Sequence, residues 1–352
     1  MALGKEVHHS GVAMLSLISL LYVATASANP VFSDEGFVFT GSSGTYSAGG
    51  VGAPTVAYDS TNGQYVMYFE YKTATTPSDC ASSYGIGRAT SPDGVTWTQG
   101  ASPVIIPSAS SAAMDHCVVS QPAIVYDEDT GVWHMLYTMA GKKPTAAATY
   151  NNEYGIAYAT STDGVAFATQ STPVIPKSGA KAPSMASAVI LDRTLTVIYV
   201  DYPNLKKAEY NLDSGTWSIG TSAVVDKSKL AWTSQWALSP ALICDGALDL
   251  HGWPDSHGLQ YGMLFGGDTA AGVRTLGLGL STTGEDWFVS MNTTASPATS
   301  LNHWDILRSG EDYLMWYSKD YSGTVKGIGL ATADENADGT WDAPSNKYCP
   351  LQ

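Results

Sequence analysis

The chain has 352 residues and a net charge of −15 at pH 7, although only 14% of its residues are charged. Such an acidic surface repels phosphate backbones, which excludes nucleic acid as an expected partner. The 35 glycines and the many Tyr and Trp residues are typical of short strands and tight turns rather than of long helices.

Residues 1–28 are predicted to be a signal peptide. Lys5 precedes an apolar stretch that ends in the small residues Ala26-Ser27-Ala28, which form a cleavage signal. The stretch is too short to span a bilayer comfortably, so cleavage is favoured over the alternative of an uncleaved anchor. We therefore expect residues 29–352 to be one secreted domain, extracellular or periplasmic, monomeric and without a membrane segment.

A pattern of strands recurs five times along the mature chain. Each copy opens with an apolar strand, passes through an Asp-containing turn into an aromatic strand, and continues into a third strand such as YGIGRATSPDGVTW. Alternating apolar and polar residues predict half-buried strands, and NG, DG and SG pairs predict hairpin turns. The copies span residues 53–97, 121–167, 184–217, 239–288 and 302–341.

This repeat predicts an all-β fold, a five-bladed β-propeller of four-stranded antiparallel blades. One such sheet cannot bury both its faces alone, whereas five stacked sheets can. Regular strands by themselves would also suit a β-sandwich or a β-helix, but a four-strand unit repeated five times disfavours both. Residues 36–44 resemble the outermost strand of a blade, so we expect them to lie beside the last blade and close the ring.

Two cysteines are predicted to form a disulfide. Cys80 lies in the loop between the second and third strands of blade one, and Cys117 lies in the loop that enters blade two. Both loops belong to the same face of adjacent blades, and an exported protein meets an oxidising environment. Cys244 and Cys349 are then either a second pair or two free thiols.

The strings P-x-V/I-x-Y-D, M-Y/L-Y and YGIG-x-ATS-x-DG-x-x-W resemble the five-bladed glycosidase propellers, namely the arabinanases and xylosidases of glycoside hydrolase family 43 and, more distantly, the invertase-type enzymes of family 32. The resemblance covers nearly the whole mature chain. It implies a secreted carbohydrate-active protein, a glycoside hydrolase acting on a polysaccharide or oligosaccharide.

The resemblance also implies catalytic positions that this chain does not fill. Those enzymes place two Asp residues and a Glu at the starts of the inner strands of blades one, two and three. The matching positions here are Gly52-Ala53-Pro54, Ser120-Gln121-Pro122 and Ala182-Pro183-Ser184, without a carboxylate. Either the catalytic carboxylates have moved, or the chain is a non-catalytic propeller that binds carbohydrate or another partner.

Loop positions at one face of the propeller select the remaining candidates. Glycoside hydrolysis needs two carboxyl groups that converge on one pocket, and the candidate carboxylates are Glu70, Asp115, Glu153 and Asp201. Aromatic faces and polar groups at the same rim suit a sugar, and the candidate binding residues are Tyr71, His116, Gln121, Tyr154, Tyr202, Trp236 and Trp304. Any single loop acid can instead be merely solvated.

One histidine and four turn acids complete the expectations. Related enzymes often carry a His beside a cation in the channel, so the resemblance implies a calcium site at His303; a buried His bonded to backbone is the alternative. The hairpin acids are expected to cap backbone groups; they are Asp59, Asp93, Asp127 and Asp163.

Overall fold

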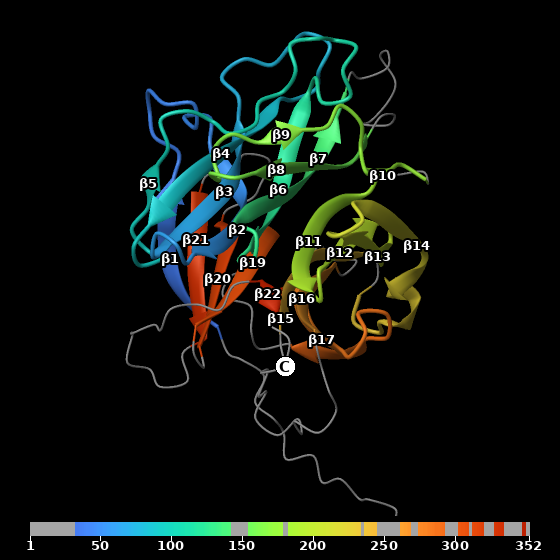
Figure 1. Ribbon diagram of the computed structural model, residues 1–352. Coiled ribbons are helices and arrows are strands. Elements are labelled where there is room, and N and C mark those ends of the chain that lie inside the picture. Colours follow the sequence, from blue (N-terminus) through green and yellow to red (C-terminus); the bar gives the residue numbers. More distant parts are fainter. Residues whose placement is uncertain are drawn as a thin grey trace, which may run out of the picture.

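Five antiparallel blades surround a common centre in the computed structural model, which confirms the five-bladed β-propeller (Figure 1). The structure describes residues 32–141, 154–178, 182–233, 236–244, 261–268, 274–292, 302–309, 312–319, 327–333 and 347–349. Within these ranges, no helix is long and apolar enough to cross a membrane. The predicted signal peptide lies outside the described residues.

Blades one and two each run from an inner strand at the centre to a short outer strand. Blade one comprises β2 (Val51–Asp59), β3 (Gln64–Lys72), β4 (Tyr84–Ser91) and β5 (Thr98–Gln99). Blade two comprises β6 (Val118–Asp127), β7 (Val132–Ala140), β8 (Tyr154–Ser161), β9 (Ala168–Thr169) and β10 (Ile175–Pro176). A single parallel bridge between Tyr84 and Val118 joins the two blades into one sheet.

Blades three and four repeat this order with longer outer strands. Blade three comprises β11 (Ser184–Leu191), β12 (Thr194–Asp201), β13 (Asn204–Asn211) and β14 (Thr216–Val225), followed by the 3₁₀ turn η1 (Lys227–Lys229). Blade four comprises β15 (Ala237–Cys244), β16 (Tyr261–Asp268), β17 (Arg274–Ser281) and β18 (Phe288–Asn292).

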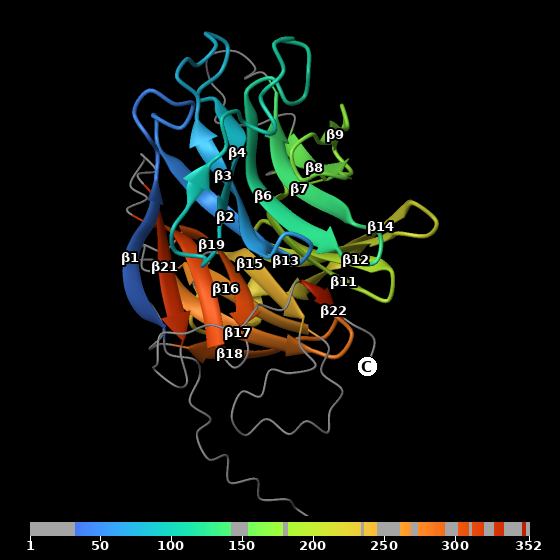
Figure 2. The same cartoon turned by 60° about the vertical axis from the view of Figure 1, so that its left-hand side comes forward.

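The N-terminal strand supplies the outer strand of blade five and so closes the ring. β1 (Ser33–Thr40) pairs antiparallel with β21 (Gly327–Ala333), outside β20 (Asp312–Lys319) and β19 (Asn302–Ser309). Figure 2 shows β1 (blue) and β21 (red) side by side. The predicted closure is confirmed, although the strand begins and ends earlier than expected.

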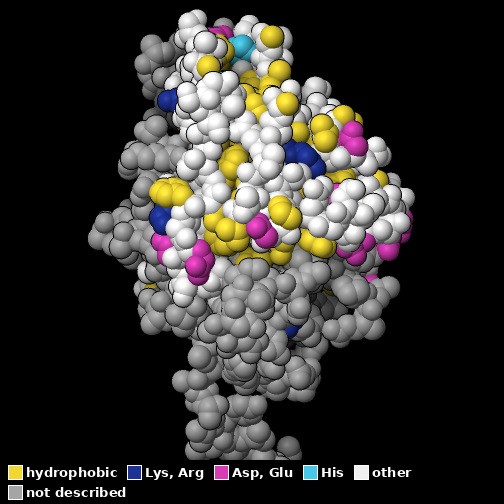
Figure 3. Space-filling model, turned by 90° about the vertical axis from the view of Figure 1, so that its left-hand side faces the viewer, with side chains coloured by type: hydrophobic (Ala, Val, Ile, Leu, Met, Phe, Trp, Pro, Cys, Tyr) yellow, Lys and Arg dark blue, Asp and Glu magenta, His cyan; other side chains and the backbone are white. Residues whose placement is uncertain are grey.

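The side of the molecule that carries β1 shows apolar side chains interspersed with charged ones (Figure 3).

The hydrophobic core consists of five layers, one between each pair of neighbouring blades. One layer joins β2 and β3 to β6 and β7, and four corresponding layers complete the circuit. The inner two strands of most blades are therefore buried on both faces, as in β3 and β7. The expectation of half-buried strands is wrong for these, because each blade is covered on both sides.

The S-x-D-G turns between the third and fourth strands bind neighbouring blades together. Asp93 accepts hydrogen bonds from the backbone N–H groups of Val95 and Thr96 at 2.9 and 2.7 Å, the predicted capping role. Gly94 has a φ of 74° in this turn. Its carbonyl accepts a hydrogen bond from Trp316 Nε1 of blade five at 2.9 Å, and Gly164 of blade two accepts one from Tyr68 at 2.6 Å.

A second set of bonds joins the blades at the channel. Thr55 Oγ1 accepts the backbone N–H of Ile124 in the next blade at 3.1 Å, and Asp305 Oδ2 accepts that of Val56 at 2.8 Å. Likewise, Ser187 Oγ of blade three accepts the backbone N–H of Leu242 in blade four at 2.9 Å. These side chains satisfy N–H groups at the inner edges of strands that have no further strand to pair with.

The C-terminal segment enters the same channel. β22 (Tyr348–Cys349) pairs parallel with the inner strand β11 (Figure 1), and Ile190 donates its N–H to the carbonyl of Lys347 at 2.9 Å. The Lys347 ammonium group forms an ion pair with Asp305 and lies 3.5 Å from Thr55 Oγ1. Both charged groups are nearly fully buried. The chain thus supplies its own counter-charge at its centre.

Replacing Lys347 with Met is expected to destabilise the protein by about 3–5 kcal/mol, because Asp305 would remain buried without its counter-charge. Urea unfolding would measure the loss, with the exposed Lys72→Met as the control. Adding Asp305→Asn to Lys347→Met should restore part of the stability, since Asn can still accept from Val56. Equal unfolding midpoints for Lys347→Met and Lys72→Met would contradict this role.

Candidate functional site at the channel mouth

Each inner strand carries one residue in the left-handed region near its first end. The five residues have φ values between 42° and 51° and are Ala53, Gln121, Met185, Ser239 and His303. Each lies at a break in the pairing between the first two strands of its blade, so the same bulge occurs five times. This conformation costs a non-glycine residue about 1–3 kcal/mol, and such residues concentrate at functional sites.

The five bulge residues line a small depression at the mouth of the channel. Its volume is about 30 Å³, and its other walls are Pro54, Pro122, Ala186, Pro240 and Trp304. Gln121 Oε1 accepts a hydrogen bond from Thr138 at 2.9 Å, while its Nε2 lies 3.5 Å from His303 Nε2. Those contacts orient one amide and one imidazole at the depression.

Trp304 adds a polar group that the described protein leaves unsatisfied. Its side chain is only 4% exposed, and its Nε1 has no hydrogen-bond partner among the described residues. A buried N–H without a partner costs about 1–3 kcal/mol. The accessible hydrogen-bonding side chains of the depression are therefore those of Gln121 and His303, with Ser239 as a further polar lining residue, among apolar walls. Such a surface suits a polar, uncharged ligand.

The structure corrects the predicted register in blade three. The position equivalent to Ala53 and Gln121 is Met185, not a residue of the segment Ala182-Pro183-Ser184. The sequence gives a signal for three of the five positions, since Ala53, Gln121 and Ser239 each directly precede a proline. After this correction, the five bulges still carry no carboxylate.

Glu70 lies behind the depression rather than in its wall. It stands opposite Gly52 on β3, is 6% exposed, and accepts hydrogen bonds from the Gln121 backbone N–H and the Ser120 hydroxyl. Burial raises its pKa to about 7, although these two hydrogen bonds lower it. Its carboxyl group therefore holds the blade-two bulge in place, and it exchanges a proton near neutrality.

The other predicted carboxylates do not meet Glu70 at the depression. Asp201 forms an ion pair with Lys206 at 2.7 Å. Asp115 is partly buried, and its negative charge contributes to the raised pKa of Tyr137, which is due mainly to burial. Glu153 lies outside the described residues. No two of the described candidates therefore form a carboxylate pair across the depression.

The predicted binding residues divide into three groups. Gln121 and Trp304 line the depression, as described above. Tyr202 and Trp236 form an edge-to-face pair with ring centroids 5.7 Å apart. Tyr71 is buried, and its ring packs against Tyr46 and the backbone of β4. The side chain of Tyr154 lies outside the described part of the structure.

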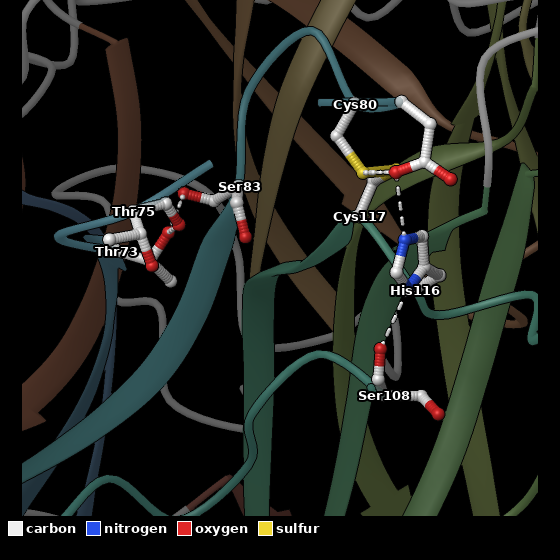
Figure 4. Close-up of a disulfide and its surroundings, with 8 residues drawn as sticks. Thr73, Thr75, Cys80, Ser83, Ser108, His116 and Cys117 are labelled. Carbon is white, nitrogen blue, oxygen red and sulfur yellow. Dashed lines mark hydrogen bonds and ion pairs between the residues drawn. A yellow bond between two sulfur atoms is a disulfide. The ribbon is translucent and has the colours of Figure 1, made fainter. Parts of the chain in front are cut away.

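The Cys80–Cys117 disulfide is confirmed, with Cα atoms 5.5 Å apart (Figure 4). His116 lies beside it, with Nε2 3.1 Å from Asp79 Oδ1 and Nδ1 2.8 Å from the Ser108 carbonyl. Both ring nitrogens face oxygen acceptors, so His116 pins two loops together. Cys244 is also disulfide-bonded, which excludes a free thiol at that position.

The described residues do not fit the expected calcium site. Calcium prefers six to eight oxygen ligands with several carboxylates. Near His303, the bulges offer one imidazole, one amide and one hydroxyl, while the closest carboxylate along its strand, Asp305, is neutralised by Lys347. In the described ranges, the only group of three potential metal-ligating side chains is Cys80, His116 and Cys117, and its two sulfur atoms are joined in a disulfide. We derive no chemistry through calcium.

Sequence comparison gives no match to a protein-family model or to a curated protein. Structural comparison does find similar folds. A glycosyl hydrolase from Bacteroides ovatus has a TM-score of 0.60 at 13% identity, covering 90% of this chain and 97% of that one. The chain has the five-bladed fold of the glycosidase propellers. The resemblance expected from the sequence is thereby confirmed at the level of the fold.

Two further similar structures belong to glycoside hydrolase family 62. The catalytic domain of the Coprinopsis cinerea α-L-arabinofuranosidase has a TM-score of 0.57 at 12% identity, covering 88% of this chain and 98% of that one. A family 62 hydrolase solved in complex with xylotriose has a TM-score of 0.57 at 12% identity, covering 87% and 98%. At such low identity, these similarities establish the shared fold alone.

Replacing Glu70 with Gln is expected to remove a pH dependence of stability. Because its folded pKa of about 7 exceeds the ordinary 4.5, Glu70 favours the folded state below pH 4.5 and loses that contribution as the pH rises through 7. The loss is about 3 kcal/mol by pH 8. Gln keeps the acceptor oxygen without the charge, so the variant should gain stability over wild type at pH 8 but not at pH 4.

Urea unfolding at pH 4, 6 and 8 would measure this dependence, with the exposed Glu128→Gln as the matched control. If wild type and Glu70→Gln lose the same stability between pH 4 and pH 8, then Glu70 does not carry the buried charge.

Proposed function

We propose that the protein is a secreted propeller that binds an uncharged carbohydrate at the mouth of its channel. The observation that carries this proposal is the ring of five left-handed bulges, one from each blade, around a depression at which the side chains of Gln121 and His303 are partly exposed. Five strained positions converge on one depression, and backbone strain of this kind concentrates at functional sites. The glycosidase fold makes carbohydrate the ligand class to test first.

Binding is favoured over hydrolysis by the residues at the depression. Hydrolysis uses one carboxyl group as the acid and a second as the base or nucleophile, on opposite sides of the bond that breaks. The bulge residues are Ala, Gln, Met, Ser and His, and Glu70 lies behind them. Amide, imidazole and indole groups can hold sugar hydroxyls but cannot replace that carboxyl pair.

Hydrolysis remains the second candidate because of one observation. A carboxyl group with a pKa of about 7 suits a general acid, and Glu70 is bonded directly to the backbone of a residue at the depression. For this role, the buried carboxyl group of Glu70 would have to become accessible to the substrate. It would also need a partner carboxylate from elsewhere on the rim. The assay below separates the two functions.

The charge and the disulfides support the rest of the proposal. The net charge of −15 repels anionic polymers, so a neutral polysaccharide is the expected ligand. The Cys80–Cys117 disulfide suits an oxidising compartment, in keeping with export by the predicted signal peptide.

Affinity electrophoresis through gels containing neutral polysaccharides, together with a reducing-end assay, would test this function. We expect wild-type protein to be retarded by at least one polysaccharide without releasing sugar. Gln121→Ala and His303→Ala should each weaken the interaction about tenfold, which corresponds to about 1.4 kcal/mol. Val165→Ser, in an exposed turn at the opposite face, is the control and should bind like wild type.

Release of reducing ends that is lost in Glu70→Gln would replace binding with the second candidate. Unchanged retardation of both Gln121→Ala and His303→Ala would show that the channel mouth is not the binding site.

A further inference from the structure

A groove of about 500 Å³ lies on the side of the propeller between blades three and four. One wall is the end of β14 and the segment around η1, and the other is the β17–β18 turn with the start of β18. Its volume falls in the range of about 300–1,000 Å³ typical of small-molecule sites. It shares no lining residue with the depression at the channel mouth.

The groove lies at the junction between blades three and four, which differs from the two other junctions where an S-x-D/T-G turn of the next blade is described. In blades one and five, the residues opposite Thr55 and Asp305 on the second strand are Tyr68 and Trp316, which donate to the turn of the next blade. The equivalent residue of blade three is Ile198, a smaller side chain without a donor. The junction between blades three and four therefore has no aromatic side chain that donates to the turn. Tyr68 does so between blades one and two, and Trp316 between blades five and one.

A lysine holds the blade-four turn instead. Lys207 Nζ donates to the Thr283 carbonyl at 3.4 Å and pairs with Glu285 at 2.7 Å and Glu209 at 2.8 Å. The turn is thus fixed by a flexible charged side chain rather than by a ring stacked across the junction. The groove adjoins this turn, since Glu285 is also one of its lining residues.

Two tryptophans in the groove are held by glycine-rich strands. A Cβ atom at Gly267 would lie 2.1 Å from Trp232 Cζ3, and one at Gly277 would lie 2.7 Å from Trp232 Cζ2, so that ring packs directly on the blade-four backbone. Trp287 packs over Gly279, and its Nε1 donates to the Gly284 carbonyl at 2.9 Å. Both rings are partly exposed and fixed in orientation.

Polar groups complete the walls of the groove. Lys229 and Asp286 are exposed, and the Asp226 carboxylate is held by the backbone and hydroxyl of Ser228 at 2.8 and 2.7 Å. Fixed indole faces present a surface for the C–H groups of a sugar ring, while carboxylate and ammonium groups bond its hydroxyls. Acidic residues outnumber Lys229 here, which disfavours an anionic chain.

We propose that this lateral groove is a second binding site for an uncharged oligosaccharide segment, separate from the channel mouth. The proposal rests on the carbohydrate-binding function proposed above and extends it, because one polysaccharide chain can engage two sites on the same molecule. Two linked contacts raise the avidity for a polymer above that for a short fragment.

Oxidative footprinting tests the groove without altering the fold. The probe is the neutral polysaccharide that retards wild-type protein most, and mass spectrometry reads oxidation at each tryptophan. Peptides carrying Trp232 and Trp287 should be protected by the polysaccharide. Trp97, which occupies the equivalent turn of blade one but packs against Trp316, is the matched control and should not change.

Calorimetry with an oligosaccharide fragment of the same polymer gives a second readout. Wild type should bind two fragments and Lys229→Ala/Asp286→Ala one, whereas His303→Ala should still bind two, with an affinity about tenfold weaker at one of the two sites. Two sites in the groove variant, or no protection of Trp232 and Trp287, would overturn this inference while leaving the channel-mouth function intact. If no polysaccharide retards wild-type protein, the proposed function itself fails.

Discussion

The inner edges of five strands meet around the channel, where most of their backbone groups have no further strand to pair with; β11, which pairs with β22, is the exception among the described strands. Asp305 accepts one of these groups, the Val56 N–H, and also accepts a hydrogen bond from the Thr55 hydroxyl. The Thr55 oxygen in turn accepts the Ile124 N–H. The carboxylate is buried, so it needs a counter-charge, and Lys347 supplies one from the far end of the chain. The ion pair thus ties the C-terminal segment to the hydrogen bonds that join blades five, one and two at the channel, while β1 closes the ring at the rim.

The channel mouth inherits its shape from the same inner strands. A bulge in each strand turns one side chain onto the depression, and Glu70 stabilises the bulge of blade two through the Gln121 N–H. A fold shared with glycosidases therefore presents five side chains at the position where a carboxylate set is expected, but with a different chemistry. Fold alone does not determine function, and here the residues at the bulges favour binding.

Repetition also explains the lateral groove. Three blades carry nearly the same S-x-D/T-G turn, yet what packs on it differs: Trp316 on the Gly94 turn, Tyr68 on the Gly164 turn and Lys207 beside Gly284. A repeat keeps the backbone constant while single side chains change the surface. At the junction between blades three and four, Ile198 has no donor for the turn, and the lateral groove lies beside it.

The sequence by itself determined the repeat, the number of blades, the closing N-terminal strand and the Cys80–Cys117 disulfide, because each depends on periodic patterns or on loops of the same face. It could not determine that Met185 is the blade-three bulge, that Glu70 is buried, or that Lys347 reaches Asp305 across the channel. Those depend on register and on contacts between residues far apart in the chain. Only the tertiary structure brings such residues together, because ring closure places the last strand beside the first.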